Sequence, residues 1–392
     1  MINNDLAGIS ISRLHEMDDF LNKTYIESKK LAGLMTTVYR KGELVHSSPM
    51  GFKDRDHNTD LDKDTIFRIY SMTKPITSIA LMMLYERGLF QLDDPVYKYI
   101  PEFKSLEVYV SGKDPDFITK PVDRPMNIHD LLTHQSGFTY DFMQTTEIDF
   151  AYEKRKIMRN KNKSLEHFVK ELSDLPLQFS PGSRWNYSVS VDVCGYLIEV
   201  LSGQTLDQYL SESIFEPLGM ADTHFKLPDF KINRFTSNYE FDESSKKLNR
   251  VDKYDSGSYS NVTWFGGGGG LVSTTKDYIK FTLALLKNKS YSNVKLVKNK
   301  TLDLMTKNHI PHLKYPWGNG IGFGLGFSVV IDETESELKD SNGTFGWSGM
   351  AGTIFRVDPK EELILIFMTQ RNHPWGDIHK IFNNFAYDSL IR

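Results

Sequence analysis

Cysteine is almost absent from this sequence, and neither sign of charge is in large excess. The single cysteine, Cys194, excludes a disulfide within the chain. The 47 Lys and Arg residues are nearly matched by 51 Asp and Glu residues, which gives a formal net charge of −4. Nucleic-acid-binding proteins usually carry a basic excess or patch, so this balance predicts no nucleic-acid partner.

Long apolar runs are also missing. The longest, such as residues 79–85, are far shorter than the roughly 18 residues that mark a membrane-spanning helix. The first ten residues, MINNDLAGIS, show no cationic stretch followed by an apolar one, so no secretory signal is visible. Together with the single cysteine, these features predict a cytoplasmic protein without a membrane partner.

The 392 residues suffice for one large domain or two, and 40% hydrophobic with 25% charged residues is an ordinary globular composition. Strand-like patterns gather near both ends of the chain, whereas helical spacing dominates the middle. We expect strands at residues 34–40, 43–46, 323–331, 352–357 and 362–368. We expect helices within residues 1–30 and at 76–86, 128–132, 165–172, 191–201, 206–213, 277–286 and 379–390.

This order of elements predicts an α/β (α+β) fold, in which one antiparallel sheet is built from both chain ends and flanked by helices. Residues 1–75 and 310–392 would form the sheet domain. Residues 76–309 would form an inserted, mostly helical domain, with the functional site in the cleft between the two parts.

The first motif with chemical meaning is Ser71-Met72-Thr73-Lys74, an S-x-x-K sequence that follows the strand-like residues 65–69 and opens a helical pattern. Residues three apart share one face of a helix, so the Lys74 amine can reach the Ser71 hydroxyl. A helix N-terminus also presents free N–H groups and the positive end of its dipole, and both would stabilise negative charge near Ser71. Ser and Lys are common, so the motif alone has little specificity.

Two further motifs lie at the borders of expected elements. Tyr187 comes just before the helix at 191–201, where a tyrosine is usually a packed aromatic residue but can also relay protons. Residues 346–349, Gly-Trp-Ser-Gly, precede the strand at 352–357. They are interpreted either as a simple turn or as a strand whose backbone N–H is directed at a substrate.

The order and spacing of these motifs resemble the serine β-lactamase-like superfamily, and most of all its esterase branch related to class C β-lactamases, the family VIII carboxylesterases. Residues 131–137 (LLTHQSG), 179–188 (FSPGSRWNYS) and 347–359 (WSGMAGTIFRVDP) also look like sequences of that branch. The matching stretches extend from about residue 34 to about residue 370, nearly the whole chain.

The resemblance implies a role for each matching residue. Ser71 would be the nucleophile, and Lys74 and Tyr187 would share the roles of general base and acid. Backbone N–H groups of Ser71 and Met350 would form the oxyanion hole. The substrate-binding residues would be Trp347, Ser348, Gly349 and Val189. No metal or organic cofactor is implied.

Two departures from β-lactamases favour an uncharged substrate. Val189 stands where β-lactamases carry the asparagine of their Tyr-x-Asn motif, and valine cannot hydrogen-bond to an amide. Trp347 stands where they carry a cation that faces the substrate carboxylate. We therefore expect a serine hydrolase that cleaves small carboxylic esters through an acyl-enzyme on Ser71. A β-lactamase, a D-amino-acid amidase or peptidase, an acyltransferase and a non-catalytic binding protein on the same fold remain alternatives.

Other patterns predict no further chemistry. Residues 346–350 nearly spell G-x-S-x-G, but the last residue is Met350, and Ser348 lacks the strand–turn–helix context of an α/β-hydrolase nucleophile. The glycines at 266–270 are not followed by the Gly-Lys-Ser/Thr of a phosphate loop. His309 and His312 flank a proline without a third metal ligand nearby, and Cys194 fits an inert core position.

Overall fold

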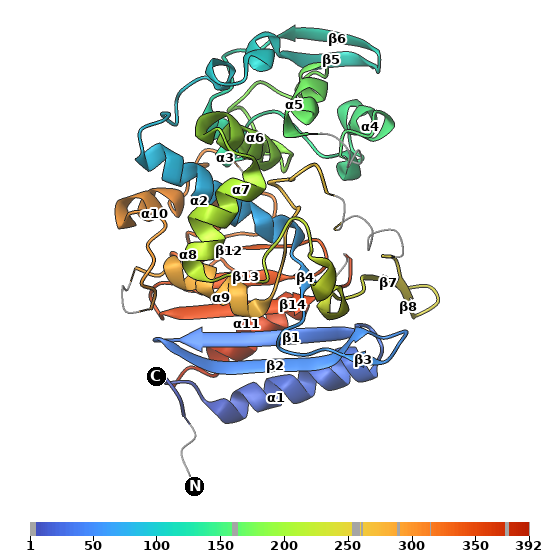
Figure 1. Ribbon diagram of the computed structural model, residues 1–392, viewed down its shortest axis with the longest axis vertical. Helices are drawn as coiled ribbons and strands as arrows, with labels where there is room; N and C mark the ends of the chain where they lie inside the picture. Colours follow the sequence, from blue (N-terminus) through green and yellow to red (C-terminus); the bar gives the residue numbers. More distant parts are fainter. Residues whose placement is uncertain are drawn as a thin grey trace.

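The two ends of the chain form one antiparallel sheet of eight strands, in the order β10-β11-β12-β13-β14-β1-β2-β3 (Figure 1). A computed structural model describes residues 5–158, 164–252, 259, 262–287, 291–313, 315–372 and 376–391. β1 joins the two ends, because it pairs with β2 on one side and with β14 on the other. The predicted fold class is confirmed. The strands of the sheet are β1 (Gly33–Arg40), β2 (Glu43–Asp54), β3 (Thr59–Asp60), β10 (Ile321–Phe323), β11 (Ser328–Val330), β12 (Phe345–Ser348), β13 (Ile354–Asp358) and β14 (Leu363–Thr369).

Helices fill most of the remaining chain. The α-helices are α1 (Ile11–Leu21), α2 (Thr73–Glu86), α3 (Ile128–Leu132), α4 (Glu147–Lys154), α5 (Leu165–Ser173), α6 (Ser190–Ser202), α7 (Leu206–Leu210), α8 (Glu216–Leu218), α9 (Thr275–Ala284), α10 (Asn299–Met305) and α11 (Ile378–Asp388). Shorter 3-10 turns are η2 (Tyr70–Met72), η3 (Val96–Lys98), η4 (Pro101–Ser105), η5 (Asp141–Met143) and η7 (Asp229–Arg234), and π-helical turns are η1 (Asn22–Glu27) and η6 (Ser211–Phe215). The other strand pairs are β4 (Phe67–Arg68) with β9 (Val272–Ser273), β5 (Glu107–Lys113) with β6 (Asp116–Pro121), and β7 (Tyr239–Asp242) with β8 (Lys247–Arg250).

Both faces of the large sheet are covered by helices, which explains why its central strands are apolar at successive positions. All seven residues of β14, LILIFMT, are buried. On one face Leu365 and Phe367 share an apolar cluster with residues of α1 and α11. On the other face the ring of Tyr278 in α9 lies 5.0 Å from that of Phe355 in β13.

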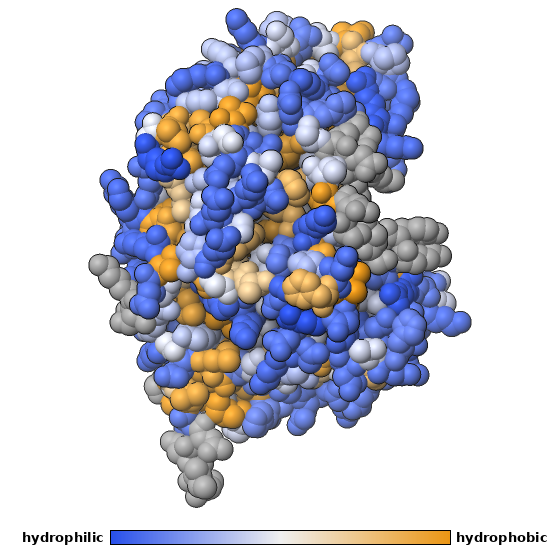
Figure 2. All heavy atoms as spheres, viewed as in Figure 1, coloured by the Kyte–Doolittle hydropathy of each residue, from blue (hydrophilic) through white to orange (hydrophobic). Residues whose placement is uncertain are grey.

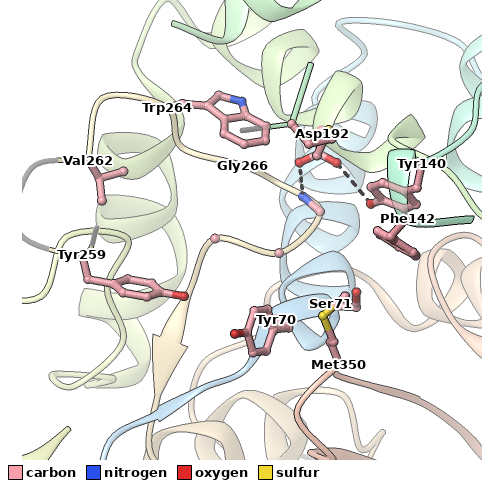
Figure 3. Close-up of a pocket in the computed structure, with 14 residues that line it drawn as sticks. Tyr70, Ser71, Tyr140, Phe142, Asp192, Tyr259, Val262, Trp264, Gly266 and Met350 are labelled. Carbon is pink, nitrogen blue, oxygen red and sulfur yellow. Dashed lines mark hydrogen bonds between the residues drawn. The ribbon is translucent and has the colours of Figure 1, made fainter. Parts of the chain in front are cut away.

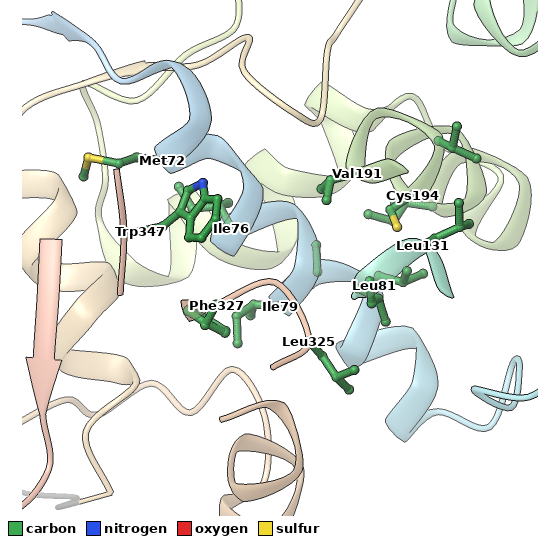
Figure 4. Packing of buried hydrophobic residues seen from close by; sticks show 14 of the residues in the cluster. Met72, Ile76, Ile79, Leu81, Leu131, Val191, Cys194, Leu325, Phe327 and Trp347 are labelled. Carbon is green, nitrogen blue, oxygen red and sulfur yellow. The ribbon is translucent and has the colours of Figure 1, made fainter. Parts of the chain in front are cut away.

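α2 is the central helix of the molecule, and it carries the S-x-x-K motif at its start. Every residue from Thr73 to Met82 is buried, as expected for a helix that is surrounded by protein on all sides. Its Ile76, Ile79 and Leu81 belong to a core cluster that also contains residues of α3, α6 and the segment before β11 (Figure 4). The core therefore fixes the position and direction of this helix.

The structure corrects one predicted strand and adds elements that the sequence did not suggest. Residues 323–331 were expected as one strand, but β10 ends at Phe323 and β11 begins at Ser328. Gly326 between them has a φ of +88°, so it belongs to a turn, although Gly320, Gly322, Gly324 and Gly326 alternate with other residues as they would in a strand. The hairpins β5–β6 and β7–β8 lie within the region expected to be helical. The division into residues 1–75 with 310–392 and 76–309 stays a prediction, and α9 packs on the sheet although it lies in the second range.

The surface and the helices agree with the composition. The face shown in Figure 2 is mainly hydrophilic, with apolar residues in separate groups, which is normal for a protein surface. None of the helices in the described part of the chain is both long and apolar enough to cross a bilayer. The cytoplasmic location and the absence of a nucleic-acid partner stay predictions.

Candidate active site

Ser71 lies in a tight turn between a short strand and the central helix. β4 ends at Arg68, the 3-10 turn η2 spans Tyr70–Met72, and α2 begins at Thr73. Tyr70 has a φ of +42°, a conformation that costs energy for a residue with a side chain and is held only by its surroundings. This strained turn leaves the Ser71 hydroxyl at the N-terminal end of a buried helix.

Lys74 extends from the first turn of α2 toward the same hydroxyl. Its Nζ donates hydrogen bonds to Ser71 Oγ at 3.2 Å and to the carbonyl oxygen of Gly268 at 2.6 Å. The residue is 1% exposed, so its ammonium group has exchanged water for these two acceptors. The structure thus brings Ser71 and Lys74 together through the i, i+3 spacing of the motif.

Tyr187 approaches Ser71 from the loop before α6. Its hydroxyl donates a hydrogen bond to Ser71 Oγ at 2.5 Å, and Lys74 Nζ lies 4.5 Å from the centre of its ring. The Tyr187 ring also lies against those of Trp317 and His134, at 5.1 and 5.0 Å between centroids. The Lys74 amine and the Tyr187 hydroxyl, two groups that can carry protons, therefore both contact the Ser71 oxygen inside an aromatic cluster.

A buried carboxylate that sequence analysis missed holds the Lys74 environment together. Asp192 is 1% exposed; its Oδ1 accepts the backbone N–H of Gly268 at 2.9 Å and its Oδ2 accepts the Tyr140 hydroxyl at 3.3 Å (Figure 3). Burial raises the pKa of this carboxyl, while the positive charge of Lys74 opposes the rise. Because Gly268 bonds to Asp192 through its N–H and to Lys74 through its C=O, it links the acid to the amine. The signal in the sequence that could have pointed to Asp192 was an acidic residue among the apolar residues at the start of α6.

The turn after β12 packs against the turn that carries Ser71. A Cβ at Gly349 would lie only 2.4 Å from the carbonyl oxygen of Ile69, so glycine permits this close approach. The Gly349 N–H is bonded to the carbonyl oxygen of Thr353 at 2.8 Å. Met350 follows and borders the same pocket as Ser71, as the proposed second N–H of an oxyanion hole requires. Ser348 is half-buried at the end of β12.

Two of the residues expected to touch the substrate, Val189 and Trp347, are buried in this structure. Val189 has no exposed surface and occupies the N-cap position of α6, and its contact with a substrate stays a prediction. Trp347 is 6% exposed and packs on Tyr187 and Trp317, at 5.8 and 5.6 Å between ring centroids. Trp347 therefore supports Tyr187 in this structure, and its direct contact with a substrate stays a prediction.

A pocket of about 310 Å³ opens at Ser71 (Figure 3). Its walls are mostly aromatic side chains and glycine backbone, and Asp192 is the one charged residue among the described residues that line it. The lining residues are Tyr70, Ser71, Tyr140, Phe142, Met158, Asp192, Tyr259, Val262, Trp264, Gly266, Gly268, Gly269, Gly270 and Met350. Such a pocket suits an apolar group of a ligand that lies beside the Ser71 hydroxyl.

The other candidates from the sequence form no second site. Cys194 is fully buried, and burial raises the pKa of its thiol, as expected of an inert core cysteine. His309 hydrogen-bonds to His129 with 3.0 Å between ring nitrogens, a pairing that sequence spacing did not indicate. Within the described ranges, no three or more His, Cys, Asp or Glu side chains are placed to hold a metal ion.

A buried S-x-x-K helix, a tyrosine on the serine oxygen and an antiparallel sheet from both chain ends define the class of serine β-lactamase-like proteins. The chain belongs to the Beta-lactamase family, whose model matches residues 19–386. Esterase EstB of Burkholderia gladioli is 26% identical over 88% of this chain and 87% of its own, which confirms the predicted resemblance to the esterase branch. Acyltransferase calJ of Penicillium decumbens is 29% identical over 81% of this chain and 78% of its own. The solved structure of EstCE1, a hydrolase with promiscuous acyltransferase activity, superposes with a TM-score of 0.84 at 22% identity, covering 96% of this chain and 99% of that one.

Proposed function

We propose that this protein is a carboxylesterase that cleaves small, uncharged esters through an acyl-enzyme on Ser71. One observation supports this function above the others. The Ser71 oxygen lies within 3.2 Å of Lys74 Nζ and 2.5 Å of the Tyr187 hydroxyl, at the mouth of an apolar pocket. A nucleophile within hydrogen-bond reach of its proton acceptor is the arrangement that acyl transfer to serine requires.

In the acylation step, Ser71 Oγ would form a bond to the ester carbonyl carbon. Its proton would pass to the pair formed by Lys74 and Tyr187, which acts as the base in the form that has already lost one proton. The carbonyl electrons would move to oxygen, where the backbone N–H groups of Ser71 and Met350 would stabilise the negative charge. When the tetrahedral intermediate collapses, the C–O bond to the alcohol breaks and the pair returns the proton to the leaving oxygen.

Hydrolysis of the acyl-enzyme would repeat these steps with water in place of the alcohol. The pair takes a proton from water as the water oxygen attacks the acyl carbon. It then returns a proton to Ser71 Oγ as that bond breaks. The carboxylic acid leaves, and the site is regenerated without a cofactor.

The charges of the pocket favour an ester over a β-lactam. A β-lactam antibiotic carries a carboxylate, which must lose its hydration on entering and needs a cation in return. Among the described lining residues the only charged group is Asp192, an acid. Lys74 is fully buried and bonded to Gly268, so it is not presented to a carboxylate at the pocket surface.

The similarity to an acyltransferase supports transfer to an alcohol as a second candidate function. Both reactions use the same acyl-enzyme, and only the group that attacks it differs. Hydrolysis of p-nitrophenyl butyrate, compared between the wild type and Ser71→Ala, tests the esterase. Adding an alcohol acceptor and measuring the ratio of new ester to free acid tests transfer. A wild type no faster than Ser71→Ala in either assay would reject both functions and leave the β-lactamase, the D-amino-acid amidase or peptidase and the non-catalytic protein as alternatives.

A further inference from the structure

Four of the five glycines at 266–270 form a backbone wall of the pocket beside Ser71. Gly266, Gly268, Gly269 and Gly270 all border the pocket, and their segment faces the aromatic side chains in Figure 3. A glycine can be required by the fold, or it can leave space for a ligand. A Cβ placed on each residue distinguishes these two cases.

Three of these glycines are required by packing. At Gly267 a Cβ would lie 2.8 Å from the carbonyl oxygen of Val191. At Gly268 it would lie 2.3 Å from Asp192 Oδ2, and at Gly270 it would lie 2.8 Å from the Phe225 ring. These distances are far below van der Waals contact, so a side chain at any of the three positions would displace its neighbours.

Gly269 differs from these neighbours. The atoms nearest to a Cβ at this position are the carbonyl carbon and oxygen of Tyr70, at 3.8 and 3.9 Å, which is ordinary contact. Its φ is outside the left-handed range that favours glycine. Neither packing nor backbone conformation explains the glycine, and the missing side chain leaves room inside the pocket.

Flat aromatic side chains also border the pocket. Tyr140 and Phe142 are stacked at 4.7 Å between ring centroids, and Trp264 is supported by Phe168 at 5.4 Å. Asp192, the charged group of this part of the pocket, already accepts hydrogen bonds on both oxygens. A cavity of roughly 150 Å³ lined by apolar side chains holds one benzene molecule. The volume here is about 310 Å³, so an acetyl or butyryl group would leave much of it unfilled.

We infer that the pocket binds a ring-bearing apolar group of the ester, and that Gly269 sets the largest group it accepts. This inference rests on the esterase function proposed above and specifies its substrate class. The ring lies between the glycine wall and the stacked aromatic side chains. It belongs either to the acyl group or to the alcohol, and the chemistry of recognition is the same for both.

The test fills the pocket from the glycine wall. In the acyl arm, a pH-stat follows hydrolysis of methyl acetate and methyl 2-naphthylacetate by the wild type, Gly269→Ala and Gly269→Val. In the alcohol arm it follows ethyl acetate and 2-naphthylmethyl acetate. The ratio of kcat/KM for the ring ester to that for the small ester should fall about 10-fold or more in Gly269→Val, and less in Gly269→Ala. A fall confined to one arm assigns the ring to that side of the ester.

A pair of exposed phenylalanines provides a matched control. Phe142 is 46% exposed and borders the pocket, whereas Phe230 is 80% exposed and does not. Phe142→Ala should lower the ring-to-small ratio by removing one wall, and Phe230→Ala should leave it unchanged. Thermal unfolding reports whether each variant folds. If Gly269→Val does not, Gly269→Ala carries the test, because its Cβ fits without moving any neighbour.

One result would overturn the inference: an unchanged ring-to-small ratio in both arms, whether the folded Gly269 variants keep their activity or lose it equally for both esters. Binding of N-(2-naphthylmethyl)acetamide, measured by saturation-transfer NMR, separates this failure from that of the esterase. If no ester is hydrolysed but the amide binds the wild type about 10-fold more tightly than Gly269→Val, the ring site stands and the esterase falls. If this amide and N-methyl-2-naphthylacetamide, which carries the ring on the acyl side, each bind the wild type and Gly269→Val equally, the ring site is rejected.

Discussion

The hydroxyl of Tyr187 can be removed with little effect on the surrounding structure, so Tyr187→Phe tests the proton chemistry directly. The hydroxyl donates one hydrogen bond, to Ser71 Oγ at 2.5 Å. The ring would stay in place, since Trp317, His134 and Lys74 contact it rather than the oxygen. The substitution therefore removes one atom from an otherwise intact site.

The expected effects on activity and on stability differ in size. Losing one hydrogen bond should lower the free energy of unfolding by about 0.5–1.5 kcal/mol. Losing a general acid or base lowers the rate by about 10²–10⁴-fold. We expect about 10³-fold, or roughly 4 kcal/mol at 1.4 kcal/mol per decade, because the hydroxyl touches the nucleophile itself. The rise in the activation free energy should thus exceed even the largest expected decrease in the free energy of unfolding.

Lys74 should act as one unit with Tyr187. Lys74→Met keeps most of the buried volume of the side chain but removes the amine that bonds to Ser71 and Gly268. Each single variant should lose about 10³-fold in kcat/KM, and the double variant should lose little more, because groups that move the same proton are not additive.

The assay is kcat/KM for p-nitrophenyl butyrate, with thermal unfolding of every variant. Tyr387→Phe is the matched control, since it also removes a buried tyrosine hydroxyl, bonded to Asp358 at 2.7 Å, but in α11. Its stability should fall and its activity should not. Near-normal turnover by Tyr187→Phe would remove Tyr187 from the mechanism. Losses that multiply in the double variant would refute the shared proton.

Three further predictions follow from the same site. A fluorophosphonate should label Ser71 in the wild type and in Ser348→Ala; label on Ser348 would move the nucleophile. The kcat/KM for a p-nitrophenyl ester should exceed that for a penicillin or a cephalosporin by about 10-fold or more, since a missing charge-assisted hydrogen bond is worth ~1.5–3 kcal/mol; an antibiotic turned over faster than every short ester would restore the β-lactamase. Because burial raises the pKa of Asp192, the folded protein holds that proton more tightly than the unfolded chain, so the carboxyl costs stability as pH rises above about 3.9. The Tm of Asp192→Asn relative to the wild type should therefore be higher at pH 7 than at pH 4, and a difference independent of pH would contradict the burial of this charge.

The elements that could be predicted from the sequence are those whose buried residues form a regular apolar pattern along the chain. β14 could be predicted because seven successive buried residues leave a clear apolar run. α2 could be predicted because an apolar pattern follows the S-x-x-K motif and ends before Gly88, which has the positive φ of a helix C-terminus. The approach of Lys74 to Ser71 follows from the same helical geometry, since both residues lie in one turn of chain.

Contacts between distant segments could not be predicted in this way. Trp317 covers the ring of Tyr187 from a loop more than 100 residues further along the chain, and nothing local to either residue indicates it. The bond between His129 and His309 has the same origin. Val189 is another case, because its place in a motif suggested a contact with substrate and gave no indication of its burial. Its burial at the start of α6 depends on the packing of that helix instead.

The glycines at 266–270 show most clearly what the sequence leaves open and the structure adds. In the sequence these five identical residues can only be interpreted together, because nothing there indicates why each position requires glycine. In the structure, Gly268 is fixed by Asp192, because a Cβ would overlap the carboxylate that Gly268 itself binds. A Cβ added at its neighbour Gly269 would meet nothing closer than 3.8 Å, so packing does not require glycine there. We therefore expect Gly268 to act on proton transfer through its hydrogen bond to Lys74, and Gly269 to act on the choice of substrate, although one peptide bond separates them.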